Sequence, residues 1–187
     1  MSAEYVITEA SEGDADLLAR LIRESFADVA RRFGLTPENS PTHPSNSQPE
    51  WIQAAFARGV RYYLLRTSGQ AAGCVALERV DDDKCYLERL AVLPAYRRRG
   101  FGEALVDHIV ATAREMGLWA IEIGTIAAQP ELRAWYERQG FVATSTRHFE
   151  SLPFDVTFMR RELTNQAPPP EETEHPGEGD VRACGSG

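Results

Sequence analysis

The sequence has few features of a secreted, membrane or metal-binding protein. No apolar run comes near the roughly 20 residues that a membrane-spanning helix needs. The opening stretch, MSAEYVITEASEGDAD, has neither the basic start nor the apolar core of a secretory signal. The three cysteines, Cys74, Cys85 and Cys184, are odd in number and fit no metal-ligand spacing. We therefore expect a cytoplasmic protein with reduced thiols, no metal and no membrane partner.

The sequence also lacks an excess of positive charge. Its formal net charge at pH 7 is −8, and half of this comes from the end of the chain, where five acidic side chains stand against Arg182. This balance argues against a non-specific nucleic-acid surface, which needs clustered lysine and arginine. It is compatible with a cationic small molecule as substrate.

Length and composition predict one folded domain with a tail. The 187 residues suffice for one domain with a sizeable core, and the 43% hydrophobic content is that of a globular protein. After Leu163 the chain continues as NQAPPPEETEHPGEGDVRACGSG, which is rich in proline, glycine and acid and has hardly an apolar residue. Such a segment cannot bury enough surface to order itself. We predict a folded domain over residues 1–163 and a disordered tail over 164–187.

Hydrophobic periodicity predicts a mixture of helices and strands. After a short strand, YVIT, helical spacing follows SEGD and continues to Gly34, and a shorter helix begins at Pro49. Three runs, VRYYLLRT, AAGCVALERV and CYLERLAVL, are joined by tight turns and predict an antiparallel meander. In this meander Cys85 pairs near Arg79, away from Cys74, which argues against a disulfide between the two cysteines. A helix, the buried strand LWAIEIG, the short helix PELRAWYERQG and a closing hairpin complete the pattern.

An arginine- and glycine-rich turn precedes a helix in AYRRRGFGEALVDHIV, residues 95–110. The start of a helix has unpaired N–H groups and a partial positive charge, which suit an anion. Gly100 and Gly102 leave the main chain uncovered, and the three arginines before them match phosphate oxygens. Leu105 stands where a dinucleotide fingerprint needs its third glycine, and the Gly-Lys-Ser/Thr step of a mononucleotide loop is absent. The turn predicts a pyrophosphate cradle, with a solvated arginine-rich turn as the alternative.

Two stretches resemble the motifs of the GNAT superfamily of N-acetyltransferases. LERLAVLPAYRRRGFGEAL resembles the acyl-CoA-binding motif, Arg/Gln-x-x-Gly-x-Gly/Ala, with Arg97, Gly100 and Gly102 in its fixed places. QPELRAWYERQGF resembles the second motif, which usually has Asn where Gln129 stands here, then Tyr136 and a Gly-Phe pair. Two motifs at the expected separation make the resemblance specific.

The resemblance extends over residues 4–163 and implies a fold and a co-substrate. The fold is the GNAT fold of the α/β (α+β) class, a mixed, mostly antiparallel central sheet of roughly six to seven strands flanked by about four helices. The co-substrate is acetyl-CoA, with no metal. The residues that the resemblance places against the coenzyme are Leu90, Ala91, Val92, Arg97, Arg98, Arg99, Gly100, Phe101, Gly102, Glu103, Gln129 and Tyr136. The N–H of Leu90 would polarise the thioester carbonyl, the main chain of Val92 would pair with the pantetheine arm, and the glycine turn would hold the pyrophosphate.

The resemblance also implies the catalytic residues. Tyr136 matches the family's general acid, which protonates the departing sulfur, while a core aromatic is the alternative for this residue. For the base, many relatives carry a carboxylate near the position of Glu88, where it acts through water. Glu122 on the neighbouring predicted strand is the competitor. A solvated or salt-bridged glutamate is the alternative for both.

Histidines in two connections are candidates to line the acceptor pocket. His43 lies in PTHPSN and His148 in TRHFES, both flanking the expected cleft. A solvated loop residue is the alternative for each. His108 lies in the middle of a predicted helix, and we expect it at the boundary between core and solvent.

These residues predict transfer of an acetyl group from acetyl-CoA to a primary amine by direct attack in a ternary complex. A cysteine nucleophile is disfavoured, because Cys74 and Cys85 lie in strands without an assigned histidine. An acyl-CoA-binding sensor without turnover and a peptide- or protein-directed acetyltransferase stay open. The loop over residues 35–48 distinguishes a peptide-directed enzyme from a small-molecule enzyme. In a peptide-directed enzyme this loop would border an open groove, whereas in a small-molecule enzyme it would cover a pocket. The sequence does not identify the acceptor. Relatives are commonly dimers, so a homodimer is another alternative.

Overall fold

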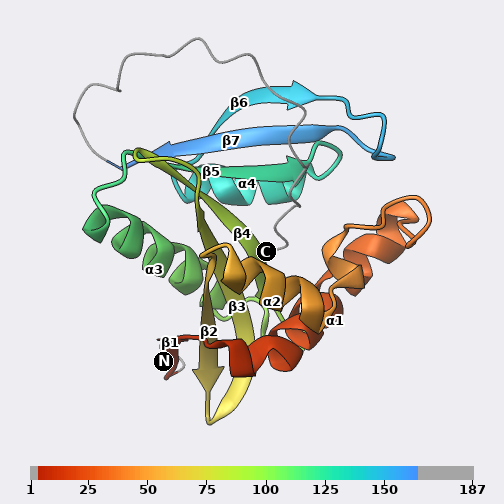
Figure 1. Ribbon diagram of the computed structural model, residues 1–187. Helices are drawn as coiled ribbons and strands as arrows, with labels where there is room; N and C mark the ends of the chain where they lie inside the picture. Colours follow the sequence, from red (N-terminus) through yellow and green to blue (C-terminus); the bar gives the residue numbers. More distant parts are fainter. Residues whose placement is uncertain (1–3, 164–187) are drawn as a thin grey trace.

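The computed structural model in Figure 1 describes residues 4–163. One seven-stranded sheet has the order β1-β2-β3-β4-β5-β7-β6. The strands are Val6–Glu9 (β1), Arg61–Thr67 (β2), Gln70–Arg79 (β3), Lys84–Val92 (β4), Ala120–Ile126 (β5), Val142–Arg147 (β6) and Val156–Glu162 (β7). The helices are Ala15–Phe33 (α1), Pro49–Ala57 (α2), Phe101–Glu115 (α3) and Pro130–Arg138 (α4). Within these described residues only β4 and β5 pair in parallel, so the predicted mixed, mostly antiparallel sheet is confirmed. The tail predicted over 164–187 lies outside the described residues.

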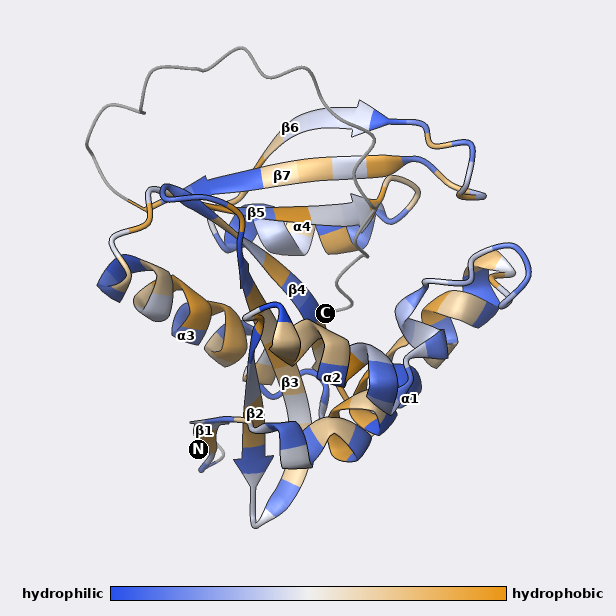
Figure 2. Cartoon of the chain, in the orientation of Figure 1, coloured by the Kyte–Doolittle hydropathy of each residue, from blue (hydrophilic) through white to orange (hydrophobic). Residues whose placement is uncertain are grey.

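Local chemistry sets both ends of α1. The Ser11 main-chain N–H donates to Asp14 Oδ2 at 2.9 Å in a capping box, which closes the 3-10 turn Glu12–Asp14 that leads directly into α1. Gly34 ends the helix with a φ of 62°, a left-handed conformation that favours glycine. Between these ends Leu18 and Phe26 belong to an apolar stripe that is fully buried. Figure 2 shows the resulting alternation of hydrophobic and hydrophilic residues along α1.

Helices cover both faces of the sheet, because successive strand residues point to opposite sides. On one face Tyr62 and Leu64 of β2 are buried together with apolar residues of α1 and α2. On the other face Tyr63 and Leu65 are buried with residues of α3 and α4. The sheet is therefore the middle of three layers at β2–β4.

The meander places two cysteines apart, as predicted. Cys85 is the register partner of Arg79, and Cys74 is the partner of Ala91. Both thiols are free and buried, and burial raises the pKa of each to about 12. Since the thiolate is the nucleophile, these side chains are inert packing residues. Cys184 lies outside the described residues.

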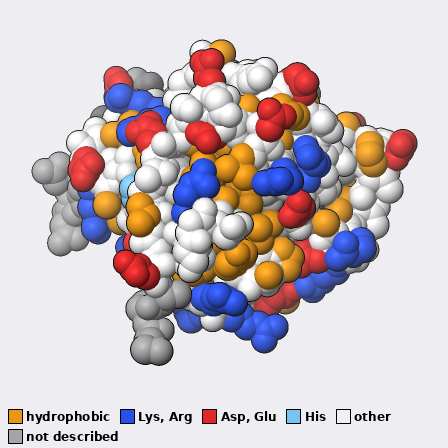
Figure 3. Space-filling view, turned by 90° about the horizontal axis from the view of Figure 1, so that it is seen from below, with side chains coloured by type: hydrophobic (Ala, Val, Ile, Leu, Met, Phe, Trp, Pro, Cys, Tyr) orange, Lys and Arg blue, Asp and Glu red, His pale blue; other side chains and the backbone are white. Residues whose placement is uncertain are grey.

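Among the described residues no helix is long and apolar enough to cross a membrane. On the face drawn in Figure 3, hydrophobic side chains gather near the centre, with acidic and basic side chains around them. The net charge of −8 therefore does not give this face a single sign.

The loop between α1 and α2 is anchored by a buried imidazole. The ring of His43 is 3% exposed and packs edge-on against Phe26 with ring centroids 5.9 Å apart. Its Nδ1 accepts a hydrogen bond from the main-chain N–H of Ser45 at 3.2 Å. Nearby, Arg23 of α1 donates to the carbonyl of Ser47 at 2.6 Å. These contacts hold the loop against the helix layer.

This anchor predicts that stability depends on the protonation of His43. Burial, with the charge of Arg89 adding to it, lowers the pKa of His43 from 6.5 to about 4. The unfolded chain therefore takes up this proton more readily, and stability falls as the pH drops from about 6.5 to 4. We expect the loss of unfolding free energy between pH 7 and pH 4.5, measured by urea denaturation, to be about 2–3 kcal/mol larger in the wild type than in His43→Asn. Parallel pH profiles for the two proteins would contradict this assignment.

Candidate functional site

The two halves of the sheet separate between β4 and β5. The parallel ladder has the pairs Lys84–Ala120, Cys85–Ile121 and Tyr86–Glu122. Beyond these pairs the strands diverge, as Figure 1 shows. An extended ligand can bind beside the edge of such a strand through main-chain hydrogen bonds. The divergence therefore creates a candidate slot along the second half of β4.

A β-bulge lies on β4 at the start of this slot. The register pairs on either side of the bulge are Ala76–Glu88 and Cys74–Ala91. Arg89 and Leu90 thus stand opposite Val75 alone, and Arg89 has a φ of 52°. Bulges bend a strand and re-aim its side chains, and they often lie next to active sites. Here the bulge changes the course of β4 at the residue expected to polarise the thioester.

A cavity of about 410 Å³ adjoins the bulge. Its wall consists of Thr42, Ser47, Trp51, Ile52, Ala54, Ala55, Arg58, Tyr62, Glu88 and Arg89. The wall thus combines the α1–α2 loop, α2, β2 and β4. Glu88, the residue predicted as the base, is 9% exposed and belongs to this wall.

The competing carboxylate lies in a different setting. Glu122 is the register partner of Arg160 on β7, and its Oε1 accepts hydrogen bonds from Arg160 Nε at 2.9 Å and Nη2 at 2.7 Å. It is not among the residues of the cavity wall. Glu122 therefore fits the alternative of a salt-bridged glutamate better than that of a catalytic base.

The structure does not bring the candidate histidines into the cavity wall. His43 anchors the α1–α2 loop beside it. His148 lies in the exposed β6–β7 connection, where its Nδ1 is 2.8 Å from Asp155 Oδ1. His108 is half-buried on α3, its ring centroid 4.5 Å from that of Tyr63, and burial lowers its pKa. Neither His43 nor His148 is therefore part of this wall, and their role toward the acceptor stays a prediction, whereas His108 is a boundary residue as expected.

The glycine turn leaves the start of α3 without a side-chain cap. Gly100 occupies the N-cap position with a φ of 80°, and an added Cβ there would meet nothing within 4 Å. Arg98 is also left-handed, with a φ of 58°. Such turns can gather successive main-chain N–H groups into a concavity that suits an anion. The side chains of Arg98 and Arg99 are exposed beside it.

Gly102 has a packing role that sequence reasoning missed. A Cβ added at Gly102 would lie 3.3 Å from Cζ2 of Trp135 on α4. Glycine at this place therefore lets α4 approach the first turn of α3. No local sequence signal indicates a contact between residues so far apart in the chain.

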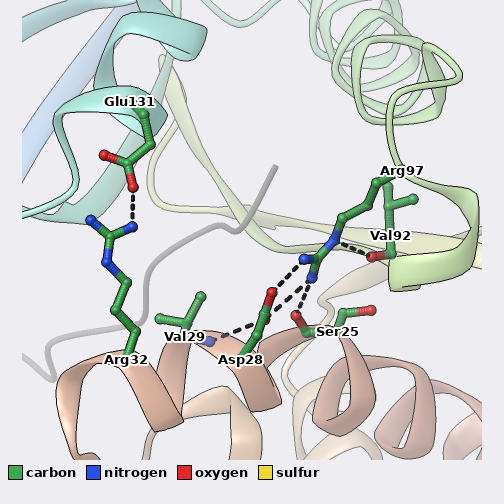
Figure 4. Close-up of polar contacts among 7 residues, drawn as sticks. All are labelled: Ser25, Asp28, Val29, Arg32, Val92, Arg97 and Glu131. Atoms are coloured by element: carbon green, nitrogen blue, oxygen red, sulfur yellow. Dashed lines mark hydrogen bonds and ion pairs between the residues drawn. The ribbon is translucent and has the colours of Figure 1, made fainter.

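The Arg97 side chain is held by the protein itself, as Figure 4 shows. Its guanidinium donates to the carboxylate of Asp28 and, at 2.7 Å, to the carbonyl of Ser25, both on α1. Its Nε donates to the carbonyl of Val92 at 3.2 Å. Burial alone would raise the pKa of Asp28, but the hydrogen bond and charge of Arg97 lower it overall. This side chain ties the glycine turn to α1 and to the end of β4.

A second ion pair links α1 to the other half of the sheet. Arg32 near the end of α1 pairs with Glu131 in the first turn of α4 (Figure 4). Exposed pairs of this kind are individually weak. Together with the Arg97–Asp28 pair, it connects α1 both to the turn before α3 and to α4.

Tyr136 and Gln129 both belong to α4 or its cap, directly after β5. Tyr136 is fully buried, with its ring edge-on to Trp135 at 4.9 Å and to Phe141 at 5.5 Å between centroids. Gln129 is 6% exposed, and its Oε1 is enclosed without a hydrogen-bond partner among the described residues. Buried amide oxygens are normally paired, so this atom is a candidate contact for a ligand. Within the described part of the chain, no cluster of His, Cys, Asp and Glu is placed to hold a metal ion.

The chain is similar to known acetyltransferases over most of its length. A family model described as "Acetyltransferase (GNAT) family" matches residues 23–141. The uncharacterized N-acetyltransferase YjgM of Escherichia coli is 30% identical over 131 residues, which cover 68% of this chain and 76% of that protein.

Solved structures share the fold. The ribosomal-protein-S18-alanine N-acetyltransferase of Escherichia coli has a TM-score of 0.70 at 18% identity, covering 88% of this chain and 97% of its own. The acetyltransferase yncA of Salmonella typhimurium, solved with its cofactor acetyl-CoA, has a TM-score of 0.68 at 17% identity, covering 89% of this chain and 98% of its own. The resemblance seen in the sequence is confirmed, and the chain belongs to the GNAT family of N-acetyltransferases.

Proposed function

We propose that this N-acetyltransferase transfers the acetyl group of acetyl-CoA to the primary amine of a small molecule, by direct attack in a ternary complex. The observation that carries the proposal is the cavity beside the β4 bulge, because its wall contains a buried carboxylate, Glu88. Leu90, the expected thioester contact, follows two residues later on the same strand. An amine in the cavity would thus be close to both a base and the acetyl group.

The coenzyme is proposed to occupy the slot between β4 and β5. Its pantetheine arm would run along Leu90, Ala91 and Val92, and its pyrophosphate would meet the main-chain N–H groups at the start of α3. The side chain of Arg97 is already paired with Asp28. The exposed side chains of Arg98 and Arg99 are therefore the ones proposed to contact the phosphates. The acetyl-CoA bound to the Salmonella relative supports this choice of co-substrate.

Two proton transfers accompany the reaction. An alkyl ammonium with a pKa of about 10.4 must lose its proton, which costs roughly 4 kcal/mol at pH 7. Glu88 is proposed to accept this proton, directly or through water. The thiolate of the coenzyme benefits from a donor as it leaves, and Tyr136 is proposed to supply that proton. A placed base or acid contributes about 10²–10⁴-fold to such a step.

The α1–α2 loop favours a small acceptor over a peptide. Thr42 and Ser47 from this loop form part of the cavity wall, and His43 anchors the loop from inside. The loop thus contributes to the cavity wall, which supports a pocket for a small acceptor. The ribosomal-protein-S18-alanine N-acetyltransferase of Escherichia coli shares the fold and is also 31% identical over 101 residues, which cover 52% of this chain and 68% of its own. A protein-directed enzyme is therefore kept as the alternative.

A thiol-release assay tests the proposal most simply. The full chain is incubated with acetyl-CoA and a panel of small amines and peptides with an N-terminal alanine, with a buffer blank for comparison. We expect release with at least one small amine. Tight binding of acetyl-CoA by calorimetry without release for any amine would favour a sensor, and release with peptides alone would favour a peptide-directed enzyme.

The choice of base predicts different pH profiles for two matched variants. Glu88→Gln should lower kcat about 10²–10⁴-fold and remove the limb of the pH–rate profile that reports the base. Glu122→Gln, which removes a charge from a cross-strand ion pair, should keep the wild-type profile. Steady-state kinetics from pH 6 to 9 compares the three proteins. A wild-type profile in Glu88→Gln would remove Glu88 from the mechanism.

The general acid predicts a split between turnover and coenzyme binding. Tyr136→Phe removes one hydroxyl and keeps the buried ring, so kcat should fall about 10²-fold or more. The Kd for acetyl-CoA should change little. Calorimetry gives the Kd, and thermal unfolding shows whether the core is intact. Full activity in a folded Tyr136→Phe protein would contradict the role of Tyr136 as the general acid and would favour a packing role in the core.

The cradle predicts that backbone strain weakens coenzyme binding only at the glycine turn. Gly100→Ala and Gly34→Ala each put a Cβ on a left-handed residue with open space around it, so both should lose about 1 kcal/mol of stability. Only Gly100→Ala should also raise the Kd for acetyl-CoA, because it shifts the N–H groups at the start of α3. Equal Kd values for the two variants would contradict the cradle.

A further inference from the structure

One arginine of the cavity wall has an enclosed donor nitrogen that no described residue pairs. Arg89 lies at the β4 bulge, and its Nη1 is enclosed without a hydrogen-bond partner among the described residues. None of the ion pairs found within residues 4–163 includes it. Enclosed guanidinium nitrogens are normally paired, because an unmatched buried donor is costly.

Three buried groups that feel the charge of Arg89 do not neutralise it. They are His43, Tyr62 and Cys74. Burial, together with Arg89, lowers the pKa of His43 to about 4, and burial raises the pKa values of Tyr62 and Cys74. All three are therefore neutral at pH 7.

The remaining charges of the wall favour an anion in the cavity. Arg58 is a second cation there, and its Nε is 3.9 Å from Glu78 Oε1, a loose contact. Against these two cations the wall contributes one carboxylate, Glu88. A ligand that brought only positive charge would face two arginines, whereas a ligand with both an amine and an anion would match both signs.

We propose that the acceptor carries an anionic group, a carboxylate or a phosphate, close to its primary amine, and that Arg89 binds this group. The inference rests on the proposed function, since it places the acceptor in the same cavity. A planar guanidinium can bind two oxygens of either anion at once. Because Glu88 and Arg89 both line the same cavity at the β4 bulge, the amine and the anion would be held near each other. The apolar part of the acceptor would lie against Trp51 and Ile52 of the wall.

The test compares acceptors that differ in the anion alone. Thiol release by the full chain is measured with L-leucine against L-leucinamide, and with phosphoethanolamine against ethanolamine. We expect kcat/KM to be about 10- to 100-fold higher for at least one anionic member than for its neutral counterpart. Leucinamide has the less basic amine, so the chemistry of the amine alone would favour the amide. A preference within only one pair identifies whether the anion is carboxylate or phosphate.

Variants connect the preference to this arginine. Arg89→Gln should remove the preference by lowering kcat/KM on the anionic acceptor more than on the neutral one, and Arg89→Lys should restore part of it. Arg20→Gln, which removes an exposed arginine of α1, is the control and should behave as the wild type. Inhibition of the wild type by 4-methylpentanoate, but not by its amide, tests the same anion site without any variant.

The possible failures can be told apart. Equal activity on acid and amide, or a preference kept in Arg89→Gln, overturns this inference and leaves the acetyltransferase standing. Better turnover of amidated peptides than of any anionic small amine also overturns it. Acetyl-CoA binding without release for any amine overturns the proposed function itself, and this inference with it.

Discussion

The short parallel ladder between β4 and β5 is the constraint on which the rest of the structure depends. Within residues 4–163, the register pairs of β4 and β5 run only from Lys84–Ala120 to Tyr86–Glu122. If the ladder continued, the main-chain groups of β4 that the proposed coenzyme site requires would be used within the sheet. Because it stops, the bulge at Arg89, the cavity and the start of α3 all lie along one strand and its immediate continuation.

The helix α1 restrains this opening from outside. Its middle holds the glycine turn through Asp28 and Arg97, and its end contacts α4 through Arg32 and Glu131. The side chain of Arg97, a motif residue, binds other parts of the protein. Its side chain fixes the turn, and the main-chain N–H groups that the turn presents are then the part suited to an anion. The loop after α1, anchored by His43, forms part of the wall of the proposed acceptor cavity.

Much of the fold could be predicted from the sequence, because its determinants are local. The capping box at Ser11, the left-handed Gly34 and the pairing of Cys85 with Arg79 follow from short-range patterns and tight turns. The site was harder to predict, since its geometry arises from contacts distant in sequence. Glu122 forms its ion pair with Arg160, which lies on a different strand. The absence of a side chain at Gly102 leaves space for the ring of Trp135. The motifs indicated candidate residues, whereas the bulge that turns Arg89 into the cavity wall depends on the register of β3 and β4.

The central claim is that the divergence of β4 and β5 forms the coenzyme site, with the pyrophosphate held by main-chain groups. A crystal structure of the full chain with coenzyme A tests this directly. The account predicts diphosphate oxygens within hydrogen-bond distance of main-chain N–H groups between Arg98 and Glu103, and a pantetheine arm beside Val92. A diphosphate bound elsewhere, or held by arginine side chains without main-chain contacts, would contradict it.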